Sequence, residues 1–138
     1  MSKRPLRSVA SAPLEDDIHD ALAQFLTVAI APPGEANGHG VMWWTVEHRN
    51  ARNAVEGAKR KKRGVVAGLP DVYVLFGGRL LAIELKRPGY APSTVSAAQR
   101  KFHAAMKACG ATVTIKTSTE SVAAFLTACR VPLRASLS

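Results

Sequence analysis

Two carboxylates and a lysine lie in one short stretch of this sequence, residues 68–89, GLPDVYVLFGGRLLAIELKRPG. Asp71 opens its first apolar run, and Glu84 and Lys86 close the second. Two close carboxylates repel each other by about 4 kcal/mol at 4 Å and an effective dielectric of about 20. A protonated carboxyl or the Lys86 ammonium relieves part of that repulsion. A divalent cation relieves it most directly, since hard cations prefer carboxylate and carbonyl oxygens.

The two apolar runs are predicted to form a β-hairpin, because only Gly77–Gly78 separates them. Both positions of a two-residue turn favour the positive φ that glycine adopts readily. Counting back from this turn places Asp71 directly opposite Glu84, with Cβ atoms about 4.5–5.5 Å apart. Period-two alternation puts Lys86 on the same face as Glu84. A β-bulge would shift this register.

The same residues have an ordinary structural interpretation. Aspartate after proline is common in turns, and Glu-x-Lys is common on solvated strands. The residues around Glu84 favour a functional interpretation. Leu81, Ile83 and Leu85 form one fully apolar face of the second run, and Leu80 and Ala82 share the face of Glu84. Such a strand is covered on both sides, and charges at its end are more often functional than decorative.

Periodicity predicts the surrounding elements. We expect a helix over 13–30, a strand over 41–48, and a short helix or ordered loop over 50–63. After the hairpin we expect a helix over 93–110, a strand over 111–117 and a helix over 121–130. This order predicts an α/β fold with a mixed central sheet flanked by helices, in which one hairpin is joined to strands returned by helical crossovers.

The two C-terminal helices carry local signals. Ser96 and Gln99 have the spacing of a capping box, and so do Thr117 and Glu120. The apolar stripe predicted for the first of these helices consists of Ala98, Phe102, Ala105 and Cys109. Cys109 is therefore expected in the core.

Length and composition bound the class of protein. The 138 residues predict one domain over 14–129, between a flexible basic tail (1–13) and a C-terminal tail (130–138). The two cysteines lack C-x-x-C spacing, which argues against a zinc site or a disulfide framework. There is no apolar run of about 18 residues and no signal-peptide core, so we expect a cytoplasmic protein that does not enter membranes.

The charge predicts a polyanionic partner. Nineteen Lys and Arg against ten Asp and Glu give a net charge of +9, and small basic domains most often bind nucleic acid. The basic run Lys59, Arg60, Lys61, Lys62 and Arg63 is expected to contact phosphates, although such runs are often only a solvated face. Arg87, directly after the candidate lysine, is a further candidate for phosphate contact.

These residues resemble a known family. Pro70-Asp71, followed by Glu84-Leu85-Lys86, is similar to the PD-(D/E)XK nuclease signature. Within that superfamily the chain resembles the virus-type replication-repair nuclease (VRR-NUC) domain, through GVVAGLPD, the short hairpin, AIELKRPG, the helix with Ser-x-x-Gln, and the acids of LEDDIHDAL. The resemblance spans roughly residues 14–126.

The resemblance implies a restriction-endonuclease-like core that cleaves phosphodiesters with Mg²⁺ or Mn²⁺. Asp71 and Glu84 would be metal ligands, and Lys86 would orient the attacking water and stabilise charge on the phosphate. The backbone carbonyl of Leu85 could supply a further ligand. Glu15 would match the acid of the first helix, and Gln99 the polar helix residue near the site.

Alternatives remain at the helper positions. Glu15 could be only an acid that favours the helix dipole, with Asp16 and Asp17 as rivals. Gln99 could be only the partner of Ser96 in the capping box. The chain departs from the family pattern at His19, where glutamine is frequent, and at Phe102, where tryptophan is frequent.

The function expected from these features is a metal-dependent, structure-selective DNA endonuclease. Stand-alone members of the family resemble Holliday-junction resolvases, so we expect a homodimer that acts on four-way junctions, in a bacterial or phage setting and associated with the nucleoid through DNA. A flap or nicking nuclease of phage or mobile-element replication is the alternative. A catalytically silent DNA-binding module is a third possibility from a different functional class.

Overall fold

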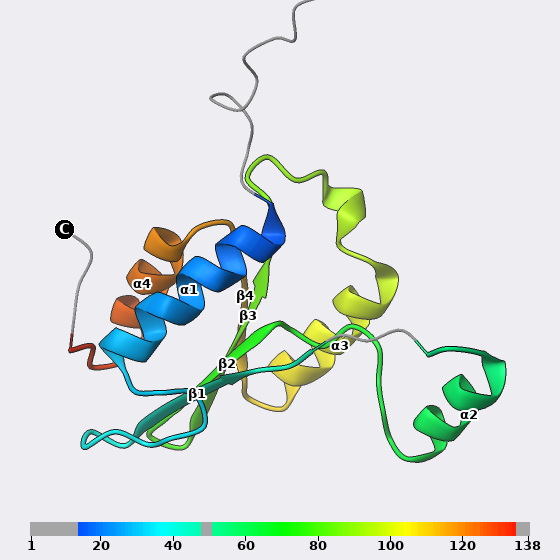
Figure 1. The fold of residues 1–138 in the computed structure, drawn as a ribbon, viewed down its shortest axis with the longest axis horizontal. Coiled ribbons are helices and arrows are strands. Elements are labelled where there is room, and N and C mark those ends of the chain that lie inside the picture. Colours follow the sequence, from blue (N-terminus) through cyan, green and yellow to red (C-terminus); the bar gives the residue numbers. More distant parts are fainter. Residues whose placement is uncertain (1–13, 48–50, 135–138) are drawn as a thin grey trace, which may run out of the picture.

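The fold is built on one mixed sheet, seen in a computed structural model that describes residues 14–47 and 51–134 (Figure 1). Its strands are β1 (Val41–Thr45), β2 (Val72–Phe76), β3 (Arg79–Leu85) and β4 (Thr112–Lys116), in the order β1-β2-β3-β4. The pairs β1–β2 and β2–β3 are antiparallel, whereas β3–β4 is parallel. The predicted α/β class with a mixed sheet is therefore confirmed.

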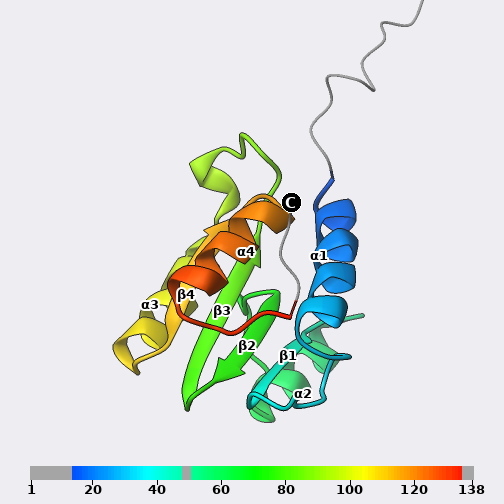
Figure 2. The same cartoon turned by 90° about the vertical axis from the view of Figure 1, so that its left-hand side faces the viewer.

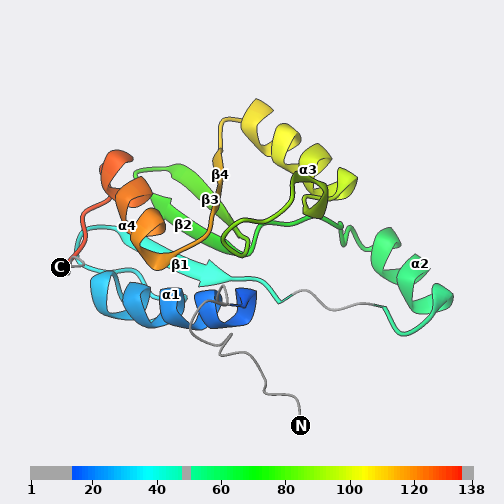
Figure 3. The same ribbon diagram turned by 90° about the horizontal axis from the view of Figure 1, so that it is seen from above.

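Helices cover both faces of the sheet. The first and last helices, α1 (Glu15–Ala29) and α4 (Thr119–Ala128), lie on one face, and α3 (Ala97–Ala108) lies on the other (Figures 2 and 3). A single 3₁₀ turn, η1 (Pro92–Thr94), lies between β3 and α3. The short helix α2 (Ala54–Lys62) lies to one side of this body, and none of its residues is buried (Figures 1 and 3).

The hairpin register is the predicted one through most of its length. Gly77 and Gly78 have φ angles of 59° and 74°, and the ladder runs from the pair nearest the turn to Val72–Ile83. Asp71 lies just beyond this ladder, and its amide donates to the Ile83 carbonyl at 3.0 Å. The expected direct pairing of Asp71 with Glu84 is therefore not part of the ladder, because the chain shifts by one residue at this point.

The larger core lies between the sheet and the α1–α4 layer. Its members come from both helices and from the first three strands, and they include Leu22, Leu26, Trp43, Leu81, Ile83, Leu85 and Leu126. Trp43 is tied in place by its indole Nε1, which donates to the Ala31 carbonyl at 2.7 Å. Under α3 a smaller cluster forms around Tyr73, Ala82 and Val113. As predicted, β3 is apolar and covered on both faces, which makes the charges at its end exceptional.

The apolar stripe predicted for α3 is not its buried face. His103 is the buried residue of this helix, whereas Ala98, Ala105 and Cys109 are exposed. The stripe members Phe102, Ala105 and Cys109 instead line a cavity of about 440 Å³ near the hairpin turn, together with Leu80. The prediction that Cys109 is a core residue is wrong for the same reason.

Two predicted boundaries also shift. The cap of α4 is formed by Ser118, whose Oγ accepts from the Ser121 amide at 3.1 Å, rather than by Thr117 and Glu120. Residues 130–138 were predicted to be a tail, but Val131 is buried in the larger core and the Arg134 amide donates to the Ala29 carbonyl at 2.7 Å. The predicted tail over 1–13 and the last four residues lie outside the described part of the chain.

Two further expectations concern the conformation of residues 50–63 and membrane-spanning helices. The Asn53 side chain caps α2 by accepting from the Glu56 amide at 2.9 Å, so the segment left open between helix and loop is a helix. Across residues 14–47 and 51–134, none of the helices has the length and apolar character needed to cross a bilayer.

Candidate active site

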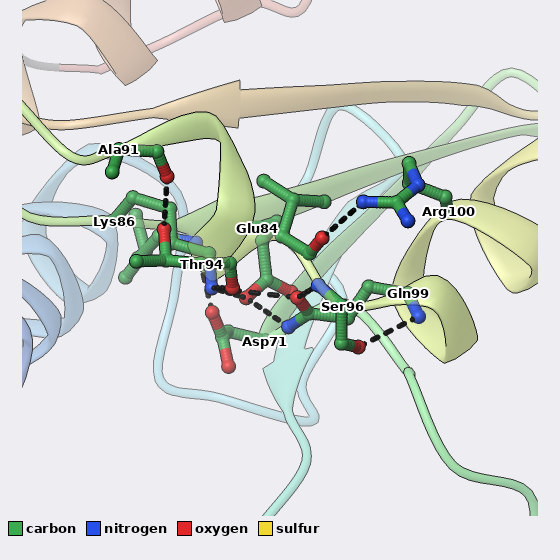
Figure 4. A network of polar contacts seen from close by, with 10 residues as sticks. Asp71, Glu84, Lys86, Ala91, Thr94, Ser96, Gln99 and Arg100 are labelled. Carbon is green, nitrogen blue, oxygen red and sulfur yellow. Dashed lines mark hydrogen bonds and ion pairs between the residues drawn. The ribbon is translucent and has the colours of Figure 1, made fainter.

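The predicted site residues gather at one end of the sheet. A cavity of about 340 Å³ is lined there by residues that include Glu15, Asp71, Glu84, Lys86 and Gln99. They come from four places in the chain: the start of α1, the residue before β2, the end of β3 and the first turn of α3. Figure 4 shows the central members of this group pointing toward one another.

Asp71 is held in place by the end of β3. Pro70, which precedes it, is buried and cannot donate to the ladder. The Leu85 amide donates to Asp71 Oδ2 at 2.8 Å, so one carboxylate oxygen is fixed against the strand that carries Glu84. It is thus the amide of Leu85 that the structure places next to Asp71, and the role of the Leu85 carbonyl as a metal ligand stays a prediction.

Glu84 is an almost fully buried acid, with 3% of its surface exposed. Its Oε2 accepts from Gln99 Nε2 at 2.9 Å and lies 3.7 Å from Lys86 Nζ. Its Oε1 is buried and has no hydrogen-bond partner among the described residues. Burial and the negative charge of Asp71 raise the Glu84 pKa to about 8, although Lys86 opposes this. Such an oxygen is costly to bury without a donor or a cation.

Lys86 is fixed at the same place. Its side chain is buried, and Nζ donates to the Thr94 carbonyl at 2.9 Å and to Gln99 Oε1 at 3.4 Å. Its amide donates to the Lys116 carbonyl at 3.0 Å, which continues the pairing of β3 with β4. The ammonium therefore has a defined position beside the carboxylates rather than a range of solvated ones.

Gln99 performs two structural tasks with one side chain. It completes the predicted capping box. The backbone amide of Gln99 donates to Ser96 Oγ at 3.1 Å, and the side-chain Oε1 accepts from the backbone amide of Ser96 at 2.9 Å. Its Nε2 meanwhile donates to Glu84. The two explanations that the sequence left open, a cap or a site contact, are both correct descriptions of its contacts.

A glycine allows the loop before Asp71 to pass α3 closely. Gly68 has a φ of +88°, and a Cβ at this position would lie 2.5 Å from the Ala98 carbonyl oxygen and 2.7 Å from the Gln99 amide nitrogen. No larger residue fits here without moving the first turn of α3, which carries Gln99. The conformation of this loop and the position of the capping residue are thus coupled.

Glu15 is the acid of the first turn of α1 that lines the cavity, and it is exposed. Its negative charge is one of the causes that raise the pKa of Glu84. Asp16 and Asp17, its rivals in the sequence, do not line this cavity. Between the acids of that turn, the structure therefore favours Glu15 as the one that acts on the site electrostatically.

His103 belongs to this region but was not predicted as a site residue. Only 7% of its surface is exposed, and its Nε2 has no hydrogen-bond partner in the part of the chain that the structure describes. Burial, Lys107 and Lys86 lower its pKa, and Asp71 opposes them. The available sequence signal is its four-residue spacing from Gln99, which places both on one face of a helix.

The predicted phosphate-binding residues fall in two places. Arg87 is exposed and directly follows Lys86, with which it lines a cavity of about 290 Å³ beside the carboxylates. The basic run Lys59–Arg63 lies on and just after α2, apart from this end of the sheet (Figure 1). Within the run, Arg60 pairs with Glu56 at 2.5 Å, and the other members are exposed.

The residues expected to bind a metal are a pair of acids. Within residues 14–47 and 51–134, no group of three or more His, Cys, Asp or Glu side chains is close enough to hold a metal ion. Asp71 and Glu84 nevertheless fit a divalent cation. The buried Oε1 of Glu84 lacks a partner, and the repulsion that raises the pKa of this acid is the kind that a cation removes.

Comparison with known proteins gives one informative result. A solved structure described as a "VRR_NUC domain protein" superimposes with a TM-score of 0.59, covering 85% of this chain and 88% of that chain. This chain has the fold of a VRR-NUC domain. The sequence identity is 18%, so the likeness carries the fold and not the chemistry. No family model and no curated protein matches the chain.

The VRR-NUC fold confirms the resemblance drawn from the sequence at the level of architecture. The matched region extends over most of both chains, in agreement with the span expected from the motifs. The hairpin and the helix that begins at the capping box are the elements that carried that resemblance, and both are present in the sheet and in α3.

Proposed function

We propose that this chain is a metal-dependent DNA endonuclease that hydrolyses phosphodiester bonds in branched DNA. The observation that carries the proposal is the carboxylate pair Asp71 and Glu84 with the Lys86 ammonium fixed beside it at the end of a buried strand. The VRR-NUC fold supports a nuclease domain in general. The substrate class and the need for a metal are part of the proposal.

Asp71 and Glu84 would hold Mg²⁺ or Mn²⁺, with the Leu85 carbonyl as a further ligand. Glu15 would complete the ligand set directly or through water. A divalent cation bound here would neutralise charge on the phosphate and make a water molecule more acidic. The fit rests on the unpartnered Oε1 of Glu84 and on the repulsion between the two acids.

The residues of the chain itself have separate tasks. Lys86, held by the Thr94 carbonyl and by Gln99, can donate to a phosphate oxygen or to the attacking water without first losing side-chain freedom. Gln99 keeps Oε2 of Glu84 turned toward α3 and leaves Oε1 for the cation. Arg87 lines the adjoining cavity beside Lys86 and can bind the phosphate next to the one that is cleaved.

DNA is the proposed partner because of the positive charge of the chain. The net charge of +9 favours association with a polyanion. We further propose that the chain acts as a homodimer on four-way junctions, since two sites related by a twofold axis would cut two symmetric strands. A flap or nicking nuclease is the alternative choice of substrate.

The test is a cleavage panel. End-labelled four-way junction, flap and duplex DNA of matched sequence are incubated with the protein in Mg²⁺, in Mn²⁺ or in EDTA. The proposal predicts cutting only with metal, and fastest on the junction. Faster cutting of the flap would replace the junction by the alternative substrate. Binding without cutting in every metal condition would leave only a DNA-binding module.

A further inference from the structure

A further cavity, separate from the three described above, lies on the side of α3 that carries His103, next to the candidate active site. Its volume is about 560 Å³, within the range of sites that hold small ligands. It is formed by the segment that follows β3, by one side of α3 and by β4. The lining residues that matter here are Tyr90, Val95, Arg100, His103, Lys107 and Ile115.

The lining combines three kinds of chemistry. Val95 is buried and Ile115 is partly buried, so they provide apolar contact, and Tyr90 adds an aromatic ring. Arg100 and Lys107 are exposed cations of the lining, and Arg100 Nη1 donates to the Val95 carbonyl at 2.5 Å, which fixes the guanidinium beside the cavity. His103 is more than nine-tenths buried, and its Nε2 has no hydrogen-bond partner within residues 14–47 and 51–134. A ligand that joins a flat apolar group to an anion would satisfy all three, and a nucleotide is such a ligand.

The cavity is a neighbour of the candidate active site, because the cavities between them share lining residues. Tyr90 also lines the smaller cavity that contains Lys86, Arg87 and Glu15. Lys86 and Glu15 in turn line the cavity of the carboxylate pair. A strand held at the carboxylates can therefore run past Arg87 and Tyr90 and reach the cavity on α3.

We propose that this cavity binds an unpaired nucleotide of the DNA strand that is engaged at the carboxylate pair. The base packs against Tyr90, Val95 and Ile115 with a polar edge toward His103 Nε2. The phosphate is bound by Arg100 and Lys107. In a duplex the bases are stacked and paired, so only a single-stranded segment can offer one to such a cavity. The inference rests on the proposed function for its DNA strand. It requires an unpaired nucleotide beside the cut, which a flap offers directly and a four-way junction offers only where base pairs at its centre have opened.

The first test is a metal-free NMR titration of the full-length ¹⁵N-labelled protein. The probes are 5′-dTMP, thymidine and inorganic phosphate. We expect 5′-dTMP to shift the resonances of His103 and Tyr90, and to do so more strongly than either of its halves at equal concentration. Unchanged His103 and Tyr90 resonances would overturn the proposal. Equal shifts with inorganic phosphate would also overturn it, because the cavity would then be a simple anion site.

The second test measures the affinity for a short oligo-dT strand without metal. Tyr90→Ala should weaken binding about fivefold or more, and Tyr90→Phe by less than about twofold, because stacking needs the ring and not the hydroxyl. Lys107→Gln should also weaken binding. Lys101→Gln, an equal charge change on the exposed side of α3, is the control. Wild-type affinity in both Tyr90→Ala and Lys107→Gln would overturn the proposal.

The two tests are independent of catalysis. A protein that cuts no DNA but shows the 5′-dTMP shifts keeps the nucleotide cavity and loses the nuclease proposal. A protein that cuts DNA with metal but shows no shift at His103 or Tyr90 keeps the nuclease and loses the cavity.

Discussion

Charged side chains are treated in opposite ways at the end of the sheet and on α2. Glu84 and Lys86 are both less than a tenth exposed, and each has specific hydrogen-bond partners. On α2 no residue is buried, and the cations of its last turn face solvent, apart from Arg60, which pairs with Glu56. Burial fixes the position of a charge at a cost in desolvation, whereas exposure keeps its long-range field at little cost.

The difference suggests that the two regions have separate tasks. Chemistry on a phosphate needs groups placed within about 0.5 Å, which fixed and buried side chains provide. Attraction to a DNA backbone needs only positive charge near the strand, which exposed lysines provide. Removing groups from each region should therefore affect cleavage and DNA binding differently.

The largest effect is expected from the carboxylate pair. Asp71→Asn should lower the cleavage rate more than about 100-fold, because the amide cannot neutralise a cation with its partner Glu84. Binding to DNA should change little, since the variant removes a negative charge. Glu120→Gln on α4 is the matched control, as an exposed acid on another helix. Wild-type cleavage by Asp71→Asn would remove Asp71 from the metal site.

A smaller effect is expected at Gln99. Gln99→Ala releases both Glu84 and Lys86 and should lower cleavage about 10–100-fold, the range seen for residues that orient metal ligands. Ser96→Ala removes the hydrogen bond that Ser96 Oγ accepts from the backbone amide of Gln99. It should cost ~1 kcal/mol of helix stability, similar to the loss of capping in Gln99→Ala. Cleavage by the two variants is compared at a temperature where both are folded. Equal losses would mean that Gln99 acts only as a cap.

The buried acid predicts a pH effect on stability without metal. The pKa of Glu84 is about 8 in the folded chain, against an ordinary value of 4.5. Between these pH values the unfolded chain has released a proton that the folded chain keeps, so the free energy of unfolding falls as the pH rises. The free energy of unfolding is measured in EDTA by thermal unfolding at each pH. The value for Glu84→Gln, relative to that of the wild type, should rise by roughly 1–3 kcal/mol from pH 5 to pH 8.5.

Added Mg²⁺ sharpens that result. The cation stabilises the carboxylate of the wild type and not the amide of the variant, so the advantage of Glu84→Gln should shrink at pH 8.5. A difference in melting temperature between variant and wild type that is constant from pH 5 to 8.5 would mean that Glu84 is not electrostatically strained.

The smallest effect is expected on α2. Lys61→Gln with Lys62→Gln should weaken DNA binding a few-fold and reduce the slope of log K against log salt by up to about 2. The cleavage rate at saturating protein should stay near that of the wild type. Lys101→Gln with Arg134→Gln removes the same charge from exposed positions elsewhere. Identical slopes in the two double variants would mean that α2 has no special role in binding.

The sequence was most informative where local geometry decides the outcome. Gly77–Gly78 set the hairpin register, which the structure confirms as far as Val72–Ile83. The capping box of Ser96 and Gln99 was readable from spacing, and it is present. The hairpin and the cap bring three of the site residues together, because one places Asp71 near Glu84 and the other places Gln99.

Contacts made by irregular segments could not be predicted. The Thr94 carbonyl that holds Lys86 depends on the path of residues 87–96, which have no periodicity to read. The buried face of α3 was predicted wrongly, because the helix buries His103 while Ala105 and Cys109 of the apolar stripe line a cavity. The one-residue shift at Asp71 likewise has no sequence signal, since it depends on how the strand ends.

The central claim is that Asp71 and Glu84 together hold a divalent cation. The most direct measurement is the free Mn²⁺ signal in electron paramagnetic resonance, recorded with wild type, Asp71→Asn and Glu120→Gln at pH 8, in the presence of a four-way junction held on ice. The wild type and Glu120→Gln should deplete the free signal beyond what the junction alone removes, and Asp71→Asn should not. Equal depletion by Asp71→Asn, or none by the wild type, would contradict the claim.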